Sequence, residues 1–208
     1  IRRDLDQVRR HRALLRRPRR KVPFPIVALV GYTNAGKSSL MNALTHAGVA
    51  VRDQLFATLD PTLRRLMLPG GRVALLSDTV GFIRKIPHQL VAAFQATLEE
   101  VQEAEILLHV VDISHAHAEL QQAAVEGVLG DLGLADRPTI LVYNKIDRLG
   151  ERPQFPWGPG SGRVATSAKT GAGLDDLRRE IVTTLNRTPL LAAPPPRTGE
   201  SERSEAPC

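Results

Sequence analysis

Short apolar runs alternate with stretches of helical periodicity through the middle of the chain. The runs are bounded by turn residues, which is typical of strands buried on both faces of a parallel sheet. They cover Ile26–Gly31, Ile106–Asp112 and Thr139–Asn144, with a shorter run at 164–167. Between them, apolar residues recur every three or four positions and predict helices. One helix begins near Lys37, and three others cover residues 87–103, 115–132 and 174–186.

Two further apolar runs, at 63–68 and Arg72–Asp78, flank the turn sequence Pro69-Gly70-Gly71. Such a pair predicts an antiparallel hairpin, which a loop over residues 49–61 precedes. The whole pattern predicts an α/β fold with a mostly parallel six-stranded sheet, one antiparallel strand pair and helices on both faces.

The two ends of the chain differ from this central region. Apolar residues at helical spacing and a net charge of +8 predict a basic amphipathic helix over residues 1–21. The whole chain carries +6, so the other residues carry −2. Residues 188–208 contain five Pro and no apolar periodicity, which predicts a disordered tail. We therefore expect a globular domain over residues 22–187, between the basic helix and the tail.

The composition excludes several classes of protein. A chain of 208 residues can bury one full core. The single cysteine, Cys208, excludes a disulfide framework and a zinc site built on several thiolates. The longest apolar runs are far shorter than a membrane span. We expect a cytoplasmic protein, and an organelle matrix is the alternative because the sequence starts at Ile1 without a Met.

Residues 31–38, Gly-Tyr-Thr-Asn-Ala-Gly-Lys-Ser, match the phosphate-loop motif G-x-x-x-x-G-K-[ST] directly after a predicted buried strand. Backbone N–H groups of such a loop surround phosphates, its lysine reaches the β- and γ-phosphates, and its serine hydroxyl binds Mg²⁺. The helix that follows adds a favourable dipole. This context disfavours the alternative, a glycine-rich turn without a ligand. The predicted phosphate-binding residues are Gly31, Tyr32, Thr33, Asn34, Ala35, Gly36, Lys37, Ser38 and Ser39.

The sequence Asp78-Thr79-Val80-Gly81 closes the second strand of the hairpin. A carboxylate at a strand end can hold Mg²⁺, and the Gly81 N–H can approach a γ-phosphate. The pattern D-x-x-G is weak by itself, because an ordinary strand-end turn fits it equally well.

Asn144, Lys145 and Asp147 close a third strand. The Asp147 carboxylate can accept hydrogen bonds from guanine N1–H and the 2-amino group, a donor pair that adenine lacks. Residues 166–169 end the last strand, and their backbone N–H groups can face guanine O6. Open α/β sheets bind ligands at the carboxyl ends of their strands, so these motifs predict one guanine-nucleotide site. The base-site candidates are Asn144, Lys145, Asp147, Ser167, Ala168 and Lys169.

In order and position, these motifs resemble those of the P-loop GTPases over residues 26–187. Four longer stretches are similar to the HflX family of ribosome-associated GTPases; they cover residues 31–38, 53–62, 78–83 and 90–99. The resemblance implies a Ras-like GTPase domain. The residues alone leave Thr58 and Thr62 as candidates for the switch threonine that joins Ser38 and Asp78 as ligands for Mg²⁺. The resemblance makes Thr58 that threonine, places Thr62 at the start of the next strand, and assigns catalysis to Lys37, Thr58 and Gly81. It also makes residues 1–21 the end of the connection to the family's N-terminal domain.

The implied activity is GTP hydrolysis by a monomeric switch protein that binds the large ribosomal subunit and ribosomal RNA. Phe82 stands where Ras-like GTPases have a water-orienting glutamine, so intrinsic hydrolysis should be slow. Asn34 either binds K⁺, as in similar cation-dependent GTPases, or only braces the first switch loop. The arginines of residues 1–21 either contact RNA phosphates or form a solvated helix face. Alternative functions are a GTP-dependent binding module and a ribosome-assembly GTPase with little intrinsic turnover.

Overall fold

The computed structural model describes residues 24–45, 62–79, 101–150 and 160–188, which together form one six-stranded sheet with its helices. The strand order across the sheet is β2-β3-β1-β4-β5-β6. The strands cover β1 (Ile26–Gly31), β2 (Thr62–Leu68), β3 (Arg72–Asp78), β4 (Ile106–Asp112), β5 (Thr139–Asn144) and β6 (Arg163–Ala165).

The sheet is parallel except at one edge. β1 pairs in parallel with β3 and β4, and β5 pairs in parallel with β4 and β6, whereas β2 and β3 are antiparallel. The carboxyl ends of five strands therefore meet along one edge of the sheet. The prediction of a mostly parallel six-stranded sheet with one antiparallel pair is confirmed.

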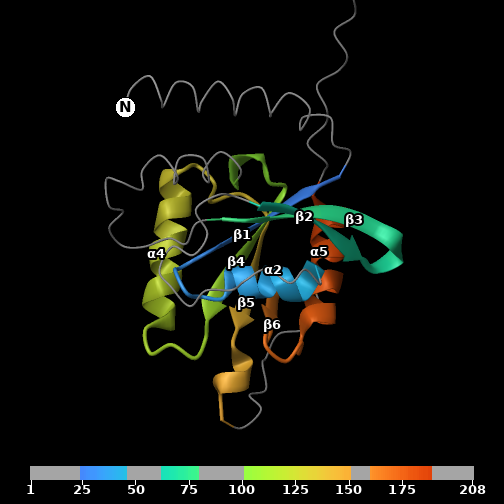
Figure 1. Cartoon of the computed structure of the whole chain (residues 1–208). Helices are drawn as coiled ribbons and strands as arrows, with labels where there is room; N and C mark the ends of the chain where they lie inside the picture. The colour runs from blue at the N-terminus through green and yellow to red at the C-terminus, as the bar shows by residue number, and fades with distance from the viewer. Residues whose placement is uncertain (1–23, 46–61, 80–100, 151–159, 189–208) are drawn as a thin grey trace, which may run out of the picture.

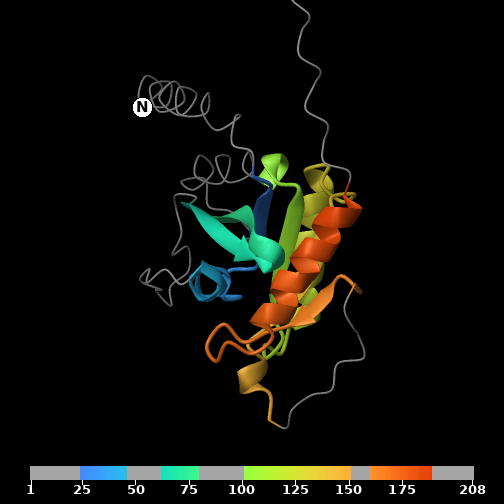
Figure 2. The same ribbon diagram turned by 90° about the vertical axis from the view of Figure 1, so that its right-hand side faces the viewer.

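Helices cover both faces of this sheet, because helical segments connect the parallel strands along the chain. On one face, α2 (Lys37–Thr45) and α5 (Leu174–Arg187) contribute apolar side chains to the larger core cluster. On the other face, α4 (Ala118–Asp131) packs in the smaller cluster with Ala28 and Val30 of β1. In Figure 1, α4 lies at the left of the strands and α5 at the right. In the view of Figure 2, α5 lies along the sheet.

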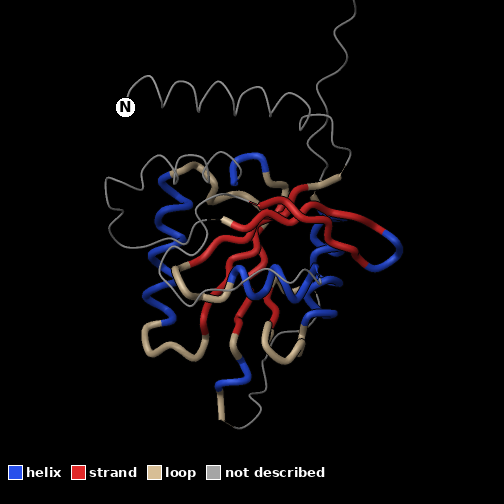
Figure 3. The backbone as a smooth tube through the Cα atoms, in the orientation of Figure 1, coloured by secondary structure: helices blue, strands red, loops and turns tan. Residues whose placement is uncertain are grey.

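The hairpin extends away from α4 and ends in the short helix η1 (Pro69–Gly71), as Figure 3 shows. Its strands are in register from Thr62 opposite Asp78 to Leu68 opposite Arg72. The Arg72 guanidinium donates a hydrogen bond of 2.6 Å to the Asn186 side chain and so ties the hairpin to α5. In this register Asp78 forms the last pair of the hairpin, so it lies at the carboxyl end of β3.

Two elements have a bound that differs from the sequence prediction by more than one residue. β6 ends at Ala165 rather than at Ser167, because the Ser167 N–H bonds to the Ala172 carbonyl and turns the chain away. That turn requires a glycine at position 173, where φ is 73° and a Cβ would lie 2.0 Å from the Ala165 oxygen. α4 begins at Ala118 rather than near residue 115, because the His115 N–H bonds to the Asp112 carbonyl in a turn.

Several predicted segments lie outside the described residues. They are the basic helix over 1–21, the loop over 49–61, most of the helix over 87–103 and the tail beyond residue 188. In the part of the chain that the structure describes, no helix has the length and apolar character needed to cross a membrane.

One titratable group lies in the core between the sheet and α4. The His109 side chain on β4 is 1% exposed, and its Nε2 atom has no hydrogen-bond partner among the described residues. Burial lowers the pKa of His109 to about 4; Glu126 opposes this shift and Lys37 reinforces it. The imidazole is therefore neutral in the folded protein at neutral pH.

This burial predicts a loss of stability in acid. Below its ordinary pKa of 6.5, His109 binds a proton more readily in the unfolded chain than in the folded one. The free energy of unfolding should therefore fall as the pH decreases from 6.5 to about 4, by on the order of 3 kcal/mol from this group. Urea unfolding across this range should show a smaller decrease for His109→Leu than for the unmodified chain. The exposed His117 is the control position, and His117→Leu should keep the full decrease.

Candidate functional site

The candidate site begins with the loop that joins β1 to α2, where the sequence places the phosphate-loop motif. The chain leaves β1 at Gly31 and enters α2 at Lys37, so the loop opens at the carboxyl edge of the sheet. Gly36 has φ of 96°, and a Cβ there would lie 2.3 Å from the side-chain nitrogen of Asn144. Only glycine fits where this loop passes the end of β5.

The Lys37 side chain is buried at the centre of the loop. Its ammonium group donates hydrogen bonds to the carbonyl oxygens of Gly31 (3.2 Å) and Tyr32 (3.0 Å). Burial lowers the pKa of Lys37 to about 8, although the nearby Asp78 carboxylate acts in the opposite direction. The ammonium therefore lacks enough negative charge around it, and a phosphate oxyanion would supply that charge.

Two oxygen side chains meet at the start of α2. The Ser38 hydroxyl donates a hydrogen bond of 2.6 Å to the Asp78 carboxylate at the end of β3. Asp78 is buried, and its register opposite Leu29 places it beside the end of β1. A hydroxyl and a carboxylate next to a phosphate loop are hard oxygen ligands of the kind that Mg²⁺ prefers, so this pair fits that ion.

The buried amide of Asn144, at the end of β5, connects two loops. Its Nδ2 donates a hydrogen bond of 3.0 Å to the Ala35 carbonyl in the phosphate loop. Its Oδ1 accepts a hydrogen bond of 3.1 Å from the Ala168 N–H after β6. A single side chain at the end of β5 therefore sets the position of the phosphate loop relative to the loop after β6.

Asp147 lies in the short helix η3 (Ile146–Arg148), beside the loop that follows β6. The Ser167 hydroxyl donates a hydrogen bond of 2.6 Å to Asp147 Oδ1, and the Thr170 N–H donates to the Ser167 hydroxyl. The carboxylate is thus oriented from the neighbouring loop. The Ala168 N–H is engaged by Asn144, so among residues 166–169 the amide of Lys169 is the one without a partner within the described residues.

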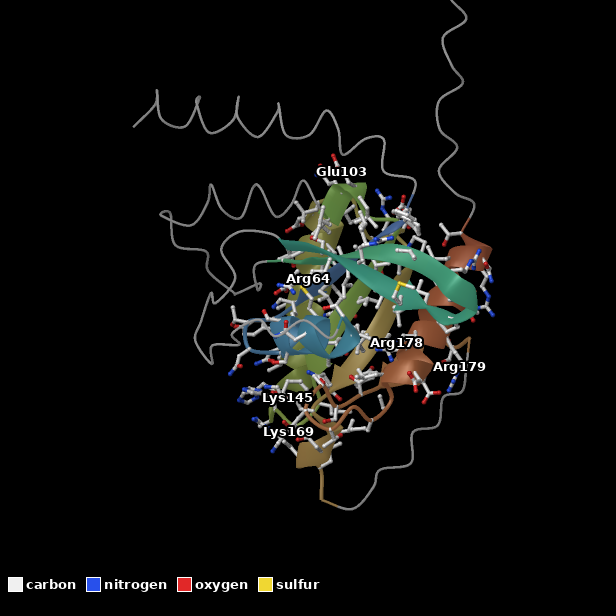
Figure 4. The ribbon with its side chains drawn as sticks, turned by 45° about the vertical axis from the view of Figure 1, so that its right-hand side comes forward. Arg64, Glu103, Lys145, Lys169, Arg178 and Arg179 are labelled. Carbon is white, nitrogen blue, oxygen red and sulfur yellow. The ribbon has the colours of Figure 1, made fainter. Side chains whose placement is uncertain are left out.

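Lys145 lies between β5 and η3, and its side chain extends toward the phosphate loop. Its ammonium group donates a hydrogen bond of 2.7 Å to the Asn34 carbonyl and lies 2.8 Å from Asp112 Oδ2. Both Asn34 and Lys145 have positive φ, 62° and 67°, although neither is a glycine. Figure 4 shows Lys145 and Lys169 at the same end of the domain, opposite the end that carries Glu103.

The structure brings most of the predicted site residues together. Residues 31–39, Asp78 and Thr79 surround the start of α2, and residues 144–147 and 167–169 lie at the ends of the neighbouring strands. Thr58, Val80 and Gly81 lie outside the described residues, as does Phe82. Sequence reasoning missed Asp112 and Ser114. The signal in the sequence was a carboxylate at the end of the apolar run Ile106–Asp112, the same position that Asp78 has in its own strand.

The sheet, its phosphate loop and the three strand-end motifs define the class of P-loop nucleotide-binding domains with a GTPase arrangement. The protein-family model described as "50S ribosome-binding GTPase" matches residues 26–145. The chain belongs to this family, and the prediction of a domain of the P-loop GTPase type is thereby confirmed.

Named relatives agree with this membership. The chain is 52% identical over 191 residues to "GTPase HflX" of Magnetococcus marinus. That alignment covers 91% of this chain and 44% of the relative. The chain is also 52% identical over 182 residues to "GTPase HflX" of Caldanaerobacter subterraneus, covering 87% of this chain and 41% of that protein. The resemblance to HflX is therefore confirmed, and the chain spans less than half the length of these two relatives.

Solved structures support the same fold. A GTP-binding protein of the archaeon Sulfolobus solfataricus, solved in complex with GDP, superposes with a TM-score of 0.62 at 26% identity. The match covers 86% of this chain and 58% of that one.

The buried ammonium of Lys37 predicts how nucleotide affinity depends on pH. With a pKa of about 8, Lys37 loses its proton in the nucleotide-free protein as the pH rises, and phosphates then bind a neutral amine. Affinity for GDP should therefore be about tenfold weaker at pH 9 than at pH 7, measured by calorimetry. Lys37→Arg keeps its charge at both pH values and serves as the control. An equal loss of affinity in Lys37→Arg would show that another group titrates.

Proposed function

We propose that this chain is a GTP-binding and GTP-hydrolysing switch domain that associates with the large ribosomal subunit. The observation that carries the proposal is the bracing by Asn144, which joins the phosphate loop to the loop after β6 at one edge of the sheet. A nucleotide whose phosphates lie at the start of α2 then has its base beside Asp147 and Lys169.

Selection of guanine follows from the donors and acceptors at that end. The Asp147 carboxylate, held by Ser167, accepts hydrogen bonds from guanine N1–H and the 2-amino group. The Lys169 N–H donates to guanine O6, while Ala168, through Asn144, holds the loop in place. Adenine lacks the donor pair and the O6 acceptor, so binding it would leave Asp147 without its partners.

Phosphate binding and hydrolysis use the start of α2. Lys37 binds the β- and γ-phosphates, and the backbone N–H groups of residues 31–39 surround them. Ser38, Asp78 and, by resemblance to HflX, Thr58 would hold Mg²⁺, which neutralises phosphate charge when it is bound. The Gly81 N–H is assigned to the γ-phosphate on the same ground. Because Phe82 cannot orient water, turnover by the chain alone is slow.

The partner proposal rests on the family and on charge. The description of the family model names binding to the 50S ribosomal subunit. The net charge of +8 on residues 1–21 can also attract RNA phosphates. A ribosomal partner implies a cytoplasmic location, and we propose a monomer in solution.

We also propose the division into residues 1–21, 22–187 and 188–208, with residues 22–187 as the GTPase domain. K⁺ at Asn34 remains a subsidiary proposal, tested by exchanging Na⁺ for K⁺ in the turnover assay.

Replacing the base-reading carboxylate tests guanine selection. In Asp147→Asn, the side-chain amide presents a donor toward two guanine donors, so GDP affinity should fall by about 2–4 kcal/mol. Xanthosine diphosphate, which carries a carbonyl at position 2, should bind this variant more tightly than GDP. Fluorescence titration with both nucleotides measures the exchange of preference. Unchanged GDP affinity in a folded Asp147→Asn protein would show that the base lies elsewhere.

Sedimentation with purified large ribosomal subunits tests the partner. The chain should co-sediment more strongly with a non-hydrolysable GTP analogue than with GDP, because a switch protein binds its partner differently in its two nucleotide states. Residues 22–208 provide the matched comparison, and they should keep nucleotide binding but lose part of the salt-dependent association. Equal sedimentation in both nucleotide states would favour a binding module whose turnover is incidental.

A further inference from the structure

A carboxylate that belongs to none of the GTPase motifs lies inside the proposed base site. Asp112 is the last residue of β4, the strand between β1 and β5, and its register partner is Asn144. Its Oδ2 lies 2.8 Å from the Lys145 ammonium, and the two side chains are 10% and 15% exposed, respectively. An ion pair this well shielded from water is stronger than one on an open surface.

The other oxygen of Asp112 is also engaged. Oδ1 accepts hydrogen bonds from the Ser114 N–H (3.1 Å) and the Ser114 hydroxyl (2.6 Å). Burial acts to raise the pKa of Asp112, but the hydrogen bonds from Lys145 and Ser114 outweigh it and lower that pKa. The carboxylate is therefore charged at neutral pH and has a fixed orientation toward Lys145.

Lys145 needs such a partner because it connects two loops. Its ammonium also donates to the Asn34 carbonyl, and its Cε would lie 3.7 Å from a Cβ placed on Gly36, so the side chain runs along the phosphate loop. A lysine side chain with several rotatable bonds loses much conformational freedom in holding this path. A charged acceptor on a buried strand compensates for that loss before any nucleotide binds.

We propose that Asp112 is a positioning residue of the base site: it holds Lys145 across the phosphate loop so that the lysine stem is ready to stack on the guanine plane. This inference deepens the proposed function and rests on it. Asp112 acts through Lys145 and not on Asp147, which is oriented separately by Ser167. It should therefore change how tightly a purine nucleotide is held and not which purine is preferred.

A double-mutant cycle on the whole chain tests this dependence. Asp112→Asn, Lys145→Met and the double variant are compared with the unmodified chain, using a fluorescent N-methylanthraniloyl derivative of GDP. Asp112→Asn should weaken binding about tenfold, mainly through faster dissociation. The double variant should bind within about twofold of Lys145→Met alone, because removing Lys145 leaves Asp112 nothing to position. Additive losses of affinity in the double variant would overturn the proposal.

Discrimination between two bases separates positioning from direct recognition. Inosine diphosphate lacks the 2-amino group that Asp147 binds, so the ratio of GDP to IDP affinity reports on Asp147. Asp112→Asn should weaken both nucleotides by the same factor and leave this ratio unchanged. A ratio that falls toward one would show that Asp112 acts on the hydrogen-bonding edge of the base, which contradicts the inference.

Two controls keep the test decisive. Asp136→Asn removes an exposed carboxylate after α4 and should bind GDP as the unmodified chain does. If Asp112→Asn does not fold, Ser114→Ala carries the test, since it loosens the carboxylate and keeps its charge. It should weaken GDP binding about threefold, and this effect should vanish in the Lys145→Met background. Absence of GDP binding by the unmodified chain would overturn the proposed function itself, whereas normal binding by Asp112→Asn would overturn this inference alone.

Discussion

The buried amide of Asn144 is the contact on which the geometry of the site depends. It donates to the phosphate loop and accepts from the loop after β6, so it sets the distance between the two regions where a nucleotide carries its phosphates and its base. An amide suits this position because it offers a donor and an acceptor without a charge. Its closeness also explains why residue 36 must be glycine.

Charged side chains lie around this amide at the carboxyl edge of the sheet. Ser38 donates to Asp78, and Lys145 is paired with Asp112, so each carboxylate has a donor. Lys37 differs, because its main partners are neutral carbonyl oxygens and its pKa is lowered to about 8. A buried cation with too little counter-charge attracts a polyanion, and its position at the start of α2 selects phosphate.

Much of the fold follows from the sequence, and the reason is visible in particular strands. β1, β3, β4 and β5 have the bounds that their apolar runs predict. The reason is clearest for β1 and β4, because strands buried on both faces leave a continuous apolar signal. β6 and the start of α4 were misplaced by two or three residues. Both bounds depend on local turns, Ser167 with Ala172 and His115 with Asp112, and apolar periodicity does not report such turns.

The residues at the strand ends, and their chemistry, can be predicted from the amino-acid sequence alone. The phosphate-loop motif, Asp78 and the run from Asn144 to Asp147 are local patterns, and an α/β sheet brings strand ends to one edge whatever the strand order. Which of these groups contact one another depends on how the strands are arranged in the folded chain. Lys145 reaches the Asn34 carbonyl across 111 positions and pairs with Asp112 because β4 lies between β1 and β5. Strand order comes from long-range packing, so no local pattern could specify this pairing.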